Sequence, residues 1–175
     1  MDVAMLERAV EDTRKIVAGT SEDQMDAPTP CTEWSVRDLL DHMIGGNEAV
    51  GGAADLPASD HVARYDASAR KMIDAFSAPG ALEKTFEMPW GDTPGPVLLG
   101  LMIADTVVHG TDLARATGQD VSVDPELAEA VYGMTSEMME PNGSFPRGTA
   151  FAPPVEVPAD APVQDKMLAY LGRRP

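Results

Sequence analysis

Cysteine is nearly absent from this chain, since Cys31 is the only one among 175 residues. A single cysteine excludes a disulfide within the sequence and a zinc site built from several thiolates. Histidine is also scarce, and the three present are His42, His61 and His109. A metal site in this sequence must therefore combine histidine with carboxylate side chains.

Basic residues are outnumbered by acidic ones. The chain has 13 Lys and Arg against 29 Asp and Glu, a formal net charge of −16. Such a surface repels phosphate backbones and anionic lipid, so we expect neither nucleic acid nor a membrane as a partner. The N-terminal segment lacks the basic stretch and apolar core of a signal peptide. No apolar run is expected to reach the roughly 20 residues that span a bilayer. With one cysteine, the expected location is cytoplasmic.

Apolar residues recur mostly at helical spacing, which predicts helices at residues 4–18, 35–50, 62–76, 93–118, 124–139 and 163–171. Thr93 and Gly118 are the expected caps of the fourth of these helices. Residues 85–88 predict a short strand or an extended arm, and residues 151–157 an edge strand. The predicted fold class is mainly α, a four-helix bundle with short β accessory segments. Residues 1–175 are expected to form a single domain, with a Pro- and Gly-rich C-terminal tail from about residue 141.

The segment at residues 93–118 is the most apolar of the predicted helices. Between residues 97 and 108 the only residues outside the apolar set are Gly100, Asp105 and Thr106. A helix that is apolar on nearly all sides lies in the middle of a bundle. Asp105 and His109 are four residues apart and so share one face of that helix. A buried carboxylate destabilises the fold unless something compensates its charge, and this sequence must supply the compensation.

Asp105 and His109 can hold a metal ion from one helix face, and His42, at the edge of the apolar stripe of the 35–50 helix, is the best candidate for a third ligand. Two histidines and one carboxylate form a common ligand set for Zn²⁺ and for non-haem Fe(II). The alternative is that Asp105 only orients His109, or pairs with Arg37 or Arg115.

The other reactive side chains have simpler expected roles. His61 is expected in a solvated connector. Cys31 is expected to pack rather than to act as a nucleophile, because the acidic neighbours Glu33 and Asp38 would raise a thiol pKa. Asp38 is expected to cap the 35–50 helix together with Ser35.

Three further residues near the predicted ligands are expected to have structural roles. Trp34 directly precedes the 35–50 helix and is expected to be a hydrophobic staple. Asp112 and Arg115 follow His109 by one turn and are expected to form an ion pair.

Two blocks of the sequence resemble a known family. The first is CTEWSVRDLLDHM, which is similar to the C-x-x-W-[ST]-V-R-D-L-x-x-H signature of mycothiol-dependent maleylpyruvate isomerase N-terminal domains. The second is IADTVVHGTDLARATGQ, which resembles that family's acid-x-x-x-His-Gly block. The C-terminal segment FAPPVEVPADAPVQDKMLAYLGRRP is similar to the tail of an uncharacterised subgroup. The family belongs to the DinB-like superfamily of metal-binding four-helix bundles.

The resemblance implies a metal site at His42, Asp105 and His109, with zinc as the usual metal and nickel or iron as alternatives. It also implies a small-molecule thiol such as mycothiol as a cofactor. The chain departs from the family pattern at two positions, since Asp105 stands where the isomerase has Glu and Thr111 where a Trp is common. The isomerase also has a further C-terminal domain that helps build its active site, and we do not expect one in this sequence.

The implied function is a divalent-metal-binding protein resembling mycothiol-dependent thiol transferases and isomerases. Its metal would activate a thiol or water for attack on an electrophilic substrate. The alternative is a non-catalytic metal-binding protein, or a structural bundle that forms a homodimer. Whether the protein is a zinc- and thiol-dependent transferase or isomerase is therefore left open by the sequence.

Overall fold

The computed structural model describes residues 1–139 and 151–175. The chain divides into two compact units, Met1–Val121 and Ser122–Pro175, and each is described separately. The start of the expected C-terminal tail, at about residue 141, lies outside the described residues.

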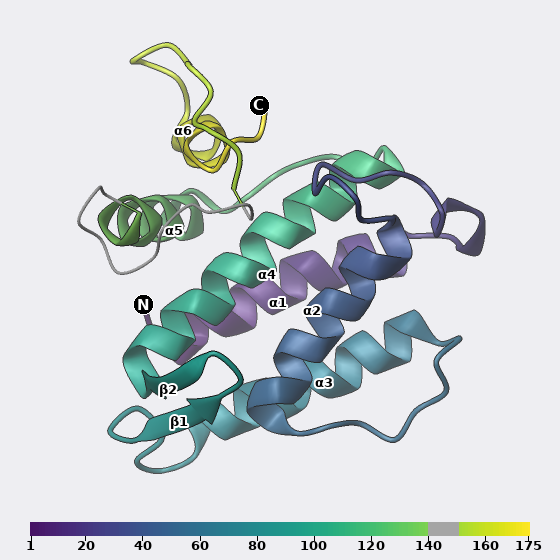
Figure 1. Cartoon of the computed structure of the whole chain (residues 1–175), viewed down its shortest axis with the longest axis vertical. Coiled ribbons are helices and arrows are strands. Elements are labelled where there is room, and N and C mark those ends of the chain that lie inside the picture. Colours follow the sequence, from purple (N-terminus) through teal and green to yellow (C-terminus); the bar gives the residue numbers. More distant parts are fainter. Residues whose placement is uncertain (140–150) are drawn as a thin grey trace. The chain divides into compact units, whose positions relative to one another are not determined.

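Four helices form the first unit (Figure 1), namely α1 at Val3–Ala18, α2 at Val36–Gly51, α3 at His61–Ser77 and α4 at Gly95–Thr117. Helix α1 packs against α3 and α4, and α2 packs against the same two helices. Each helix therefore contacts two others around a common core, which confirms the predicted four-helix bundle. A short 3₁₀ helix, η1, follows α1 at Glu22–Gln24.

Strands β1 (Thr85–Met88) and β2 (Gly91–Pro94) form an antiparallel hairpin that joins α3 to α4. The predicted strand at residues 85–88 is confirmed, but the predicted cap of α4 is wrong. Thr93 pairs with Phe86 in the hairpin, and its hydroxyl donates to the carbonyl of Gly91. The Thr93 side chain therefore bonds within the hairpin, and Pro94 occupies the N-cap position of α4. Gly118 ends α4 in the left-handed conformation (φ 70°), as predicted.

The start of α2 follows the predicted capping pattern. Ser35 accepts a hydrogen bond from the backbone N–H of Asp38, and the Asp38 carboxylate accepts one from the backbone N–H of Ser35 at 2.9 Å. This reciprocal pair fixes where the helix begins. It therefore also fixes the turn on which His42 lies.

Helix α4 is the apolar centre of the bundle. By length and composition it is the one helix within residues 1–139 and 151–175 that could cross a membrane, contrary to the expectation that no run would be long enough. However, 78% of its most apolar stretch is buried inside the protein, as is typical of a core helix. The core residues that are fully covered include Leu6, Leu39, Ile44, Met72, Leu98, Ile103 and Leu113.

The second unit contains helices α5 (Pro125–Met138) and α6 (Val163–Tyr170), which pack against each other. The side chain of Asp124 caps α5 and Pro125 occupies its first turn, as predicted. The predicted edge strand at residues 151–157 is wrong, because that segment forms no strand. Its two consecutive prolines have no N–H to donate, and the N–H of Val155 bonds instead to the carbonyl of Ala169.

Candidate metal centre

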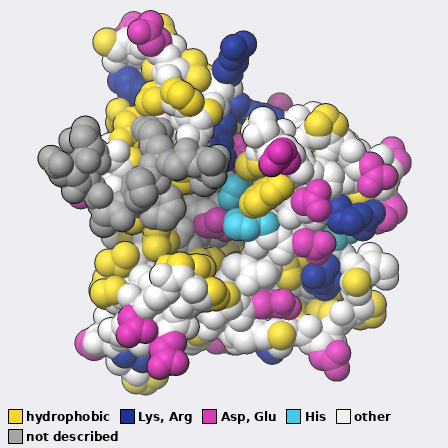
Figure 2. Space-filling view, in the orientation of Figure 1, with side chains coloured by type: hydrophobic (Ala, Val, Ile, Leu, Met, Phe, Trp, Pro, Cys, Tyr) yellow, Lys and Arg dark blue, Asp and Glu magenta, His cyan; other side chains and the backbone are white. Residues whose placement is uncertain are grey.

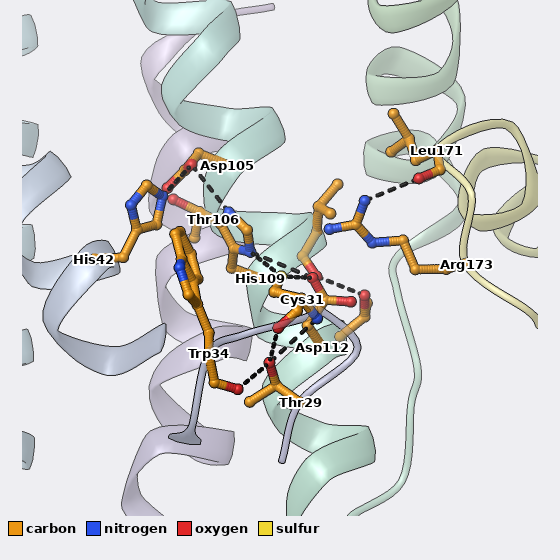
Figure 3. Close-up of polar contacts among 12 residues, drawn as sticks. Thr29, Cys31, Trp34, His42, Asp105, Thr106, His109, Asp112, Leu171 and Arg173 are labelled. Atoms are coloured by element: carbon orange, nitrogen blue, oxygen red, sulfur yellow. Dashed lines mark hydrogen bonds and ion pairs between the residues drawn. The ribbon is translucent and has the colours of Figure 1, made fainter. Parts of the chain in front are cut away.

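The three predicted ligands lie together where α2 packs against α4 (Figure 3). His42 Nε2 is 3.2 Å from Asp105 Oδ1, and His109 Nε2 is 3.4 Å from the same oxygen. The two imidazole rings are 4.8 Å apart between centroids and nearly perpendicular, at 81°. Both rings thus direct Nε2 at a single carboxylate oxygen.

These distances fit the requirements of a tetrahedral metal ion. With metal–ligand bonds of about 2.0–2.1 Å, neighbouring donors of a tetrahedral Zn²⁺ lie about 3.3–3.4 Å apart. The two separations from Asp105 Oδ1 are 3.2 and 3.4 Å. All three donor atoms lie within 4.8 Å of one another. The donor set of two imidazoles and one carboxylate is therefore chemically suited to zinc, and its two nitrogen–oxygen separations match those between ligands of a tetrahedral ion.

The centre is partly open to solvent. The side chains are 39% exposed for His42, 28% for Asp105 and 13% for His109. Histidine side chains reach the surface in the space-filling view, and acidic side chains are spread over the same face (Figure 2). A small ion or molecule can thus reach the centre from the side of His42.

The attraction between Asp105 and His109 shifts the pKa values of both groups toward their charged forms. Burial acts to raise the pKa of Asp105, but the adjacent charge of His109 and hydrogen bonds from His109 and His42 hold it well below its usual range. Burial acts to lower the pKa of His109, but the Asp105 charge and the hydrogen bonds that the ring makes to Asp105, Asp112 and Cys31 raise it well above the usual value. Without a metal, Asp105 and His109 therefore form an ion pair, and a metal ion must compete with a proton on His109.

Of the two arginines that the sequence offered as partners for Asp105, one pairs with a different carboxylate. Arg37 forms a salt bridge to Glu22 at 3.0 Å. The charge of Asp105 is compensated instead by His42 and His109. Asp105 does more than orient His109, because the same oxygen also contacts a histidine from another helix.

Trp34 contributes to this centre in a way that the sequence did not predict. Its ring centroid lies 4.7 Å from that of His42 and 6.0 Å from that of His109 (Figure 3). The expected role was a staple at the start of α2, but the indole packs against both imidazoles. It therefore restricts the orientation of the two histidines of the candidate centre.

Cys31 and Asp112 were also missed. Cys31 Sγ donates to Asp112 Oδ2 at 3.3 Å and lies 3.8 Å from His109 Nδ1. His109 Nδ1 is 3.3 Å from the same Asp112 oxygen. The spacing of Asp112, three residues after His109, was a usable signal because such residues share a helix face. Cys31 had no such signal, since a loop brings it to α4.

His61 does not take part in this centre. It is the first residue of α3 and half-buried, not in a solvated connector as expected. Among the described residues it belongs to neither group of side chains that could hold a metal ion.

The fold and the site define a class, the four-helix bundles with a histidine and carboxylate cluster between two helices, and this is consistent with the DinB-like superfamily. The model of one family, the mycothiol maleylpyruvate isomerase N-terminal domain, matches residues 6–58, which include His42. Two uncharacterized proteins of Mycobacterium tuberculosis, from strains CDC 1551 / Oshkosh and H37Rv, are each 37% identical over 180 residues. These alignments cover 99% of this chain and 98% of each relative. The chain therefore belongs to the same family as these two uncharacterized proteins. No solved structure matches it significantly.

Proposed function

We propose that this protein binds one divalent metal ion, preferably Zn²⁺, through His42, Asp105 and His109, and uses it to activate a small-molecule thiol such as mycothiol. The observation that most supports the proposal is the convergence of two imidazole Nε2 atoms on Asp105 Oδ1 at 3.2 and 3.4 Å. The thiol is suggested by the description of the matching family, which names mycothiol. We also propose that the protein acts in the cytoplasm, where its single cysteine would stay reduced.

The chain's own residues have distinct tasks in this proposal. His42 and His109 would bind as neutral imidazoles and Asp105 as a carboxylate, and Trp34 would hold both rings in place. When bound, a divalent cation with three protein ligands lowers the pKa of a thiol or water in its remaining position. The exposed edge of His42 leaves the centre accessible to the thiol and to an electrophilic substrate.

Metal analysis tests the first half of the proposal. Wild-type protein reconstituted with zinc and then desalted should retain about one Zn²⁺ per chain, measured by mass spectrometry of the metal. His109→Ala should lose the zinc, whereas His61→Ala should retain it, because His61 lies outside the cluster. A wild type that retains no zinc, or an His109→Ala variant that retains as much as wild type, would show that the metal site is wrong.

Thiol binding tests the second half. Cobalt-loaded protein titrated with mycothiol should develop an intense thiolate-to-metal absorption, and the His42→Ala variant should not. The second candidate function, a non-catalytic bundle, is favoured by the Asp105–His109 ion pair, which compensates both charges without a metal. Zinc binding by the wild type, together with no thiolate-to-metal absorption when the cobalt-loaded protein is titrated with mycothiol, would support that alternative.

A further inference from the structure

The second ring nitrogen of His109 is not used by the proposed metal centre. Nε2 faces Asp105, while Nδ1 faces the other side of the ring, where Cys31 and Asp112 lie (Figure 3). Asp112 is completely buried, with no exposed surface, and its Oδ2 is 3.3 Å from Nδ1. A buried carboxylate so close to one nitrogen has a defined chemical effect on the other.

That effect follows from the chemistry of imidazole. A neutral imidazole carries a proton on one nitrogen and a lone pair on the other. An ionised carboxylate can only accept hydrogen bonds, so Asp112 selects the tautomer with the proton on Nδ1. The lone pair is then on Nε2, the atom that faces Asp105 and lies 3.4 Å from its Oδ1.

We propose that Asp112 is a positioning residue, which fixes the tautomer and ring orientation of His109 so that Nε2 is the metal-binding atom. The inference rests on the proposed metal site. Cys31 assists as a thiol, because its Sγ donates to the same Asp112 oxygen at 3.3 Å and holds that oxygen between two donors. Groups that hold a metal-binding histidine in this way contribute about 10- to 100-fold to metal affinity.

The competing arrangement is a metal held by Cys31, His109 and Asp112, which are also close enough to share an ion. It would take Nδ1 as the ligand and leave a proton on Nε2. Exposure favours the assignment to Nε2, because His42 and Asp105 are 39% and 28% exposed while Asp112 is 0% exposed. An ion and its thiol ligand reach the first cluster more readily than the second.

Nuclear magnetic resonance of zinc-loaded wild type tests this assignment without any substitution. Long-range proton–nitrogen correlations of the His109 ring should report a protonated Nδ1 and a zinc-bound Nε2. X-ray absorption of the same sample should show nitrogen and oxygen neighbours and no sulfur neighbour. Zinc on Nδ1, or a sulfur neighbour, would overturn the inference while leaving the protein a metal-binding one.

Variants of Asp112 test how much this residue contributes to zinc affinity. Asp112→Ala should weaken zinc binding about 10- to 100-fold, and Asp112→Asn, whose amide oxygen can still accept from Nδ1, should restore part of the loss. Thr111→Val is the matched control, because Thr111 is a buried neighbour whose hydroxyl donates to the carbonyl of Val108 at 2.7 Å. It should reduce the free energy of unfolding without changing zinc affinity.

The two possible failures are distinguishable. If wild type binds no zinc, the proposed function is wrong and the inference fails with it. If wild type binds zinc and Asp112→Ala binds it equally well, the inference alone is wrong, and Asp112 serves only to stabilise the fold. If Asp112→Ala does not fold, the resonance assignment of wild type decides between Nε2 and Nδ1.

Discussion

His42 and Asp105 are 63 residues apart in the chain, yet His42 Nε2 lies 3.2 Å from Asp105 Oδ1. The contact joins α2 to α4, so the candidate centre forms only when the bundle is correctly packed. The centre also contains the Asp105–His109 ion pair, whose two charges support each other in a largely covered environment. Removal of either charge should therefore change the free energy of unfolding even in the metal-free protein.

Asp105→Asn should destabilise the metal-free protein by about 1–3 kcal/mol, because a charged hydrogen bond to His109 is lost. Urea unfolding in the presence of a chelator measures this difference. Asp41→Asn is the matched control, since Asp41 pairs with Arg64 at 2.8 Å but is 53% exposed. The control should lose at most about 1 kcal/mol. A more stable Asp105→Asn variant would mean that the carboxylate is uncompensated until metal binds.

The ion pair also gives the metal-free protein a defined pH dependence. Because the folded-state pKa of His109 is raised above its unfolded value of about 6.5, its contribution is fully present below that value and is lost as the pH rises through the folded pKa. The difference in unfolding free energy between wild type and His109→Gln should therefore shrink as the pH is raised from neutral into the alkaline range. A difference that grows with pH would contradict the raised pKa.

Zinc affinity should change with pH in the opposite direction. His109 holds a proton at neutral pH in the metal-free protein, and zinc must displace it. Affinity should rise with pH until the raised pKa is passed and then level off. Asp105 should contribute no proton in this range, because its pKa is held below the usual range. Titration calorimetry in buffers of different ionisation enthalpy should detect about one proton released per zinc at neutral pH. Release of no proton would show that His109 is already neutral.

Much of the fold follows from patterns that the sequence carries locally. Apolar periodicity and capping residues located the helices and the start of α2, since these depend on neighbours within a few residues. The Asp105 and His109 pair was visible for the same reason, because four-residue spacing determines which residues share a helix face. His42 was only a candidate from its place at the edge of an apolar stripe, and the resemblance to the family was needed to imply it as a ligand, since its contact with Asp105 depends on tertiary packing.

Cys31 and Trp34, which lie beside the candidate ligands, could not be predicted to do so, because a loop places them. The segment before α2 closes on itself through a bond from the N–H of Thr29 to the carbonyl of Trp34 at 3.2 Å. Glu33 in this turn has a φ of 81°, a conformation that is uncommon for a residue with a side chain. This local geometry determines where Cys31 and Trp34 point, and periodicity carries no information about it.

Trp34→Ala should weaken zinc binding more than Trp34→Phe, because the aromatic ring packs against the imidazoles of both candidate ligands, His42 and His109. Loss of the ring frees His42 and His109 to adopt other orientations, and ordering them again opposes binding. We expect a loss of about 10-fold for Trp34→Ala, the lower end for groups that orient ligands. Trp90→Ala is the matched control, since Trp90 is 60% exposed at the hairpin. Equal affinities for Trp34→Ala and wild type would show that the helices alone orient the histidines.

Gly110, which directly follows His109 in α4, determines how closely α4 approaches α1. A Cβ at this position would lie 2.6 Å from Thr13 Oγ1 and 3.3 Å from Thr13 Cγ2. The Thr13 side chain cannot easily move, because it is buried and its hydroxyl donates to the carbonyl of Thr106 at 3.2 Å. Gly110→Ala should therefore destabilise the protein by about 1–3 kcal/mol, partly offset by the better helix propensity of alanine.

Gly110→Ala should no longer destabilise the protein once the Thr13 side chain is shortened. In a Thr13→Ala background the obstructing atoms are gone, so Gly110→Ala should be neutral or stabilising by up to about 1 kcal/mol. Gly45→Ala, at a helix position where a Cβ meets nothing within 4 Å, should be stabilising in both backgrounds. Urea unfolding of the four variants of the Thr13 and Gly110 cycle measures the coupling directly. Additive effects would mean that α1 and α4 can separate without cost, and that this contact does not determine the position of His109.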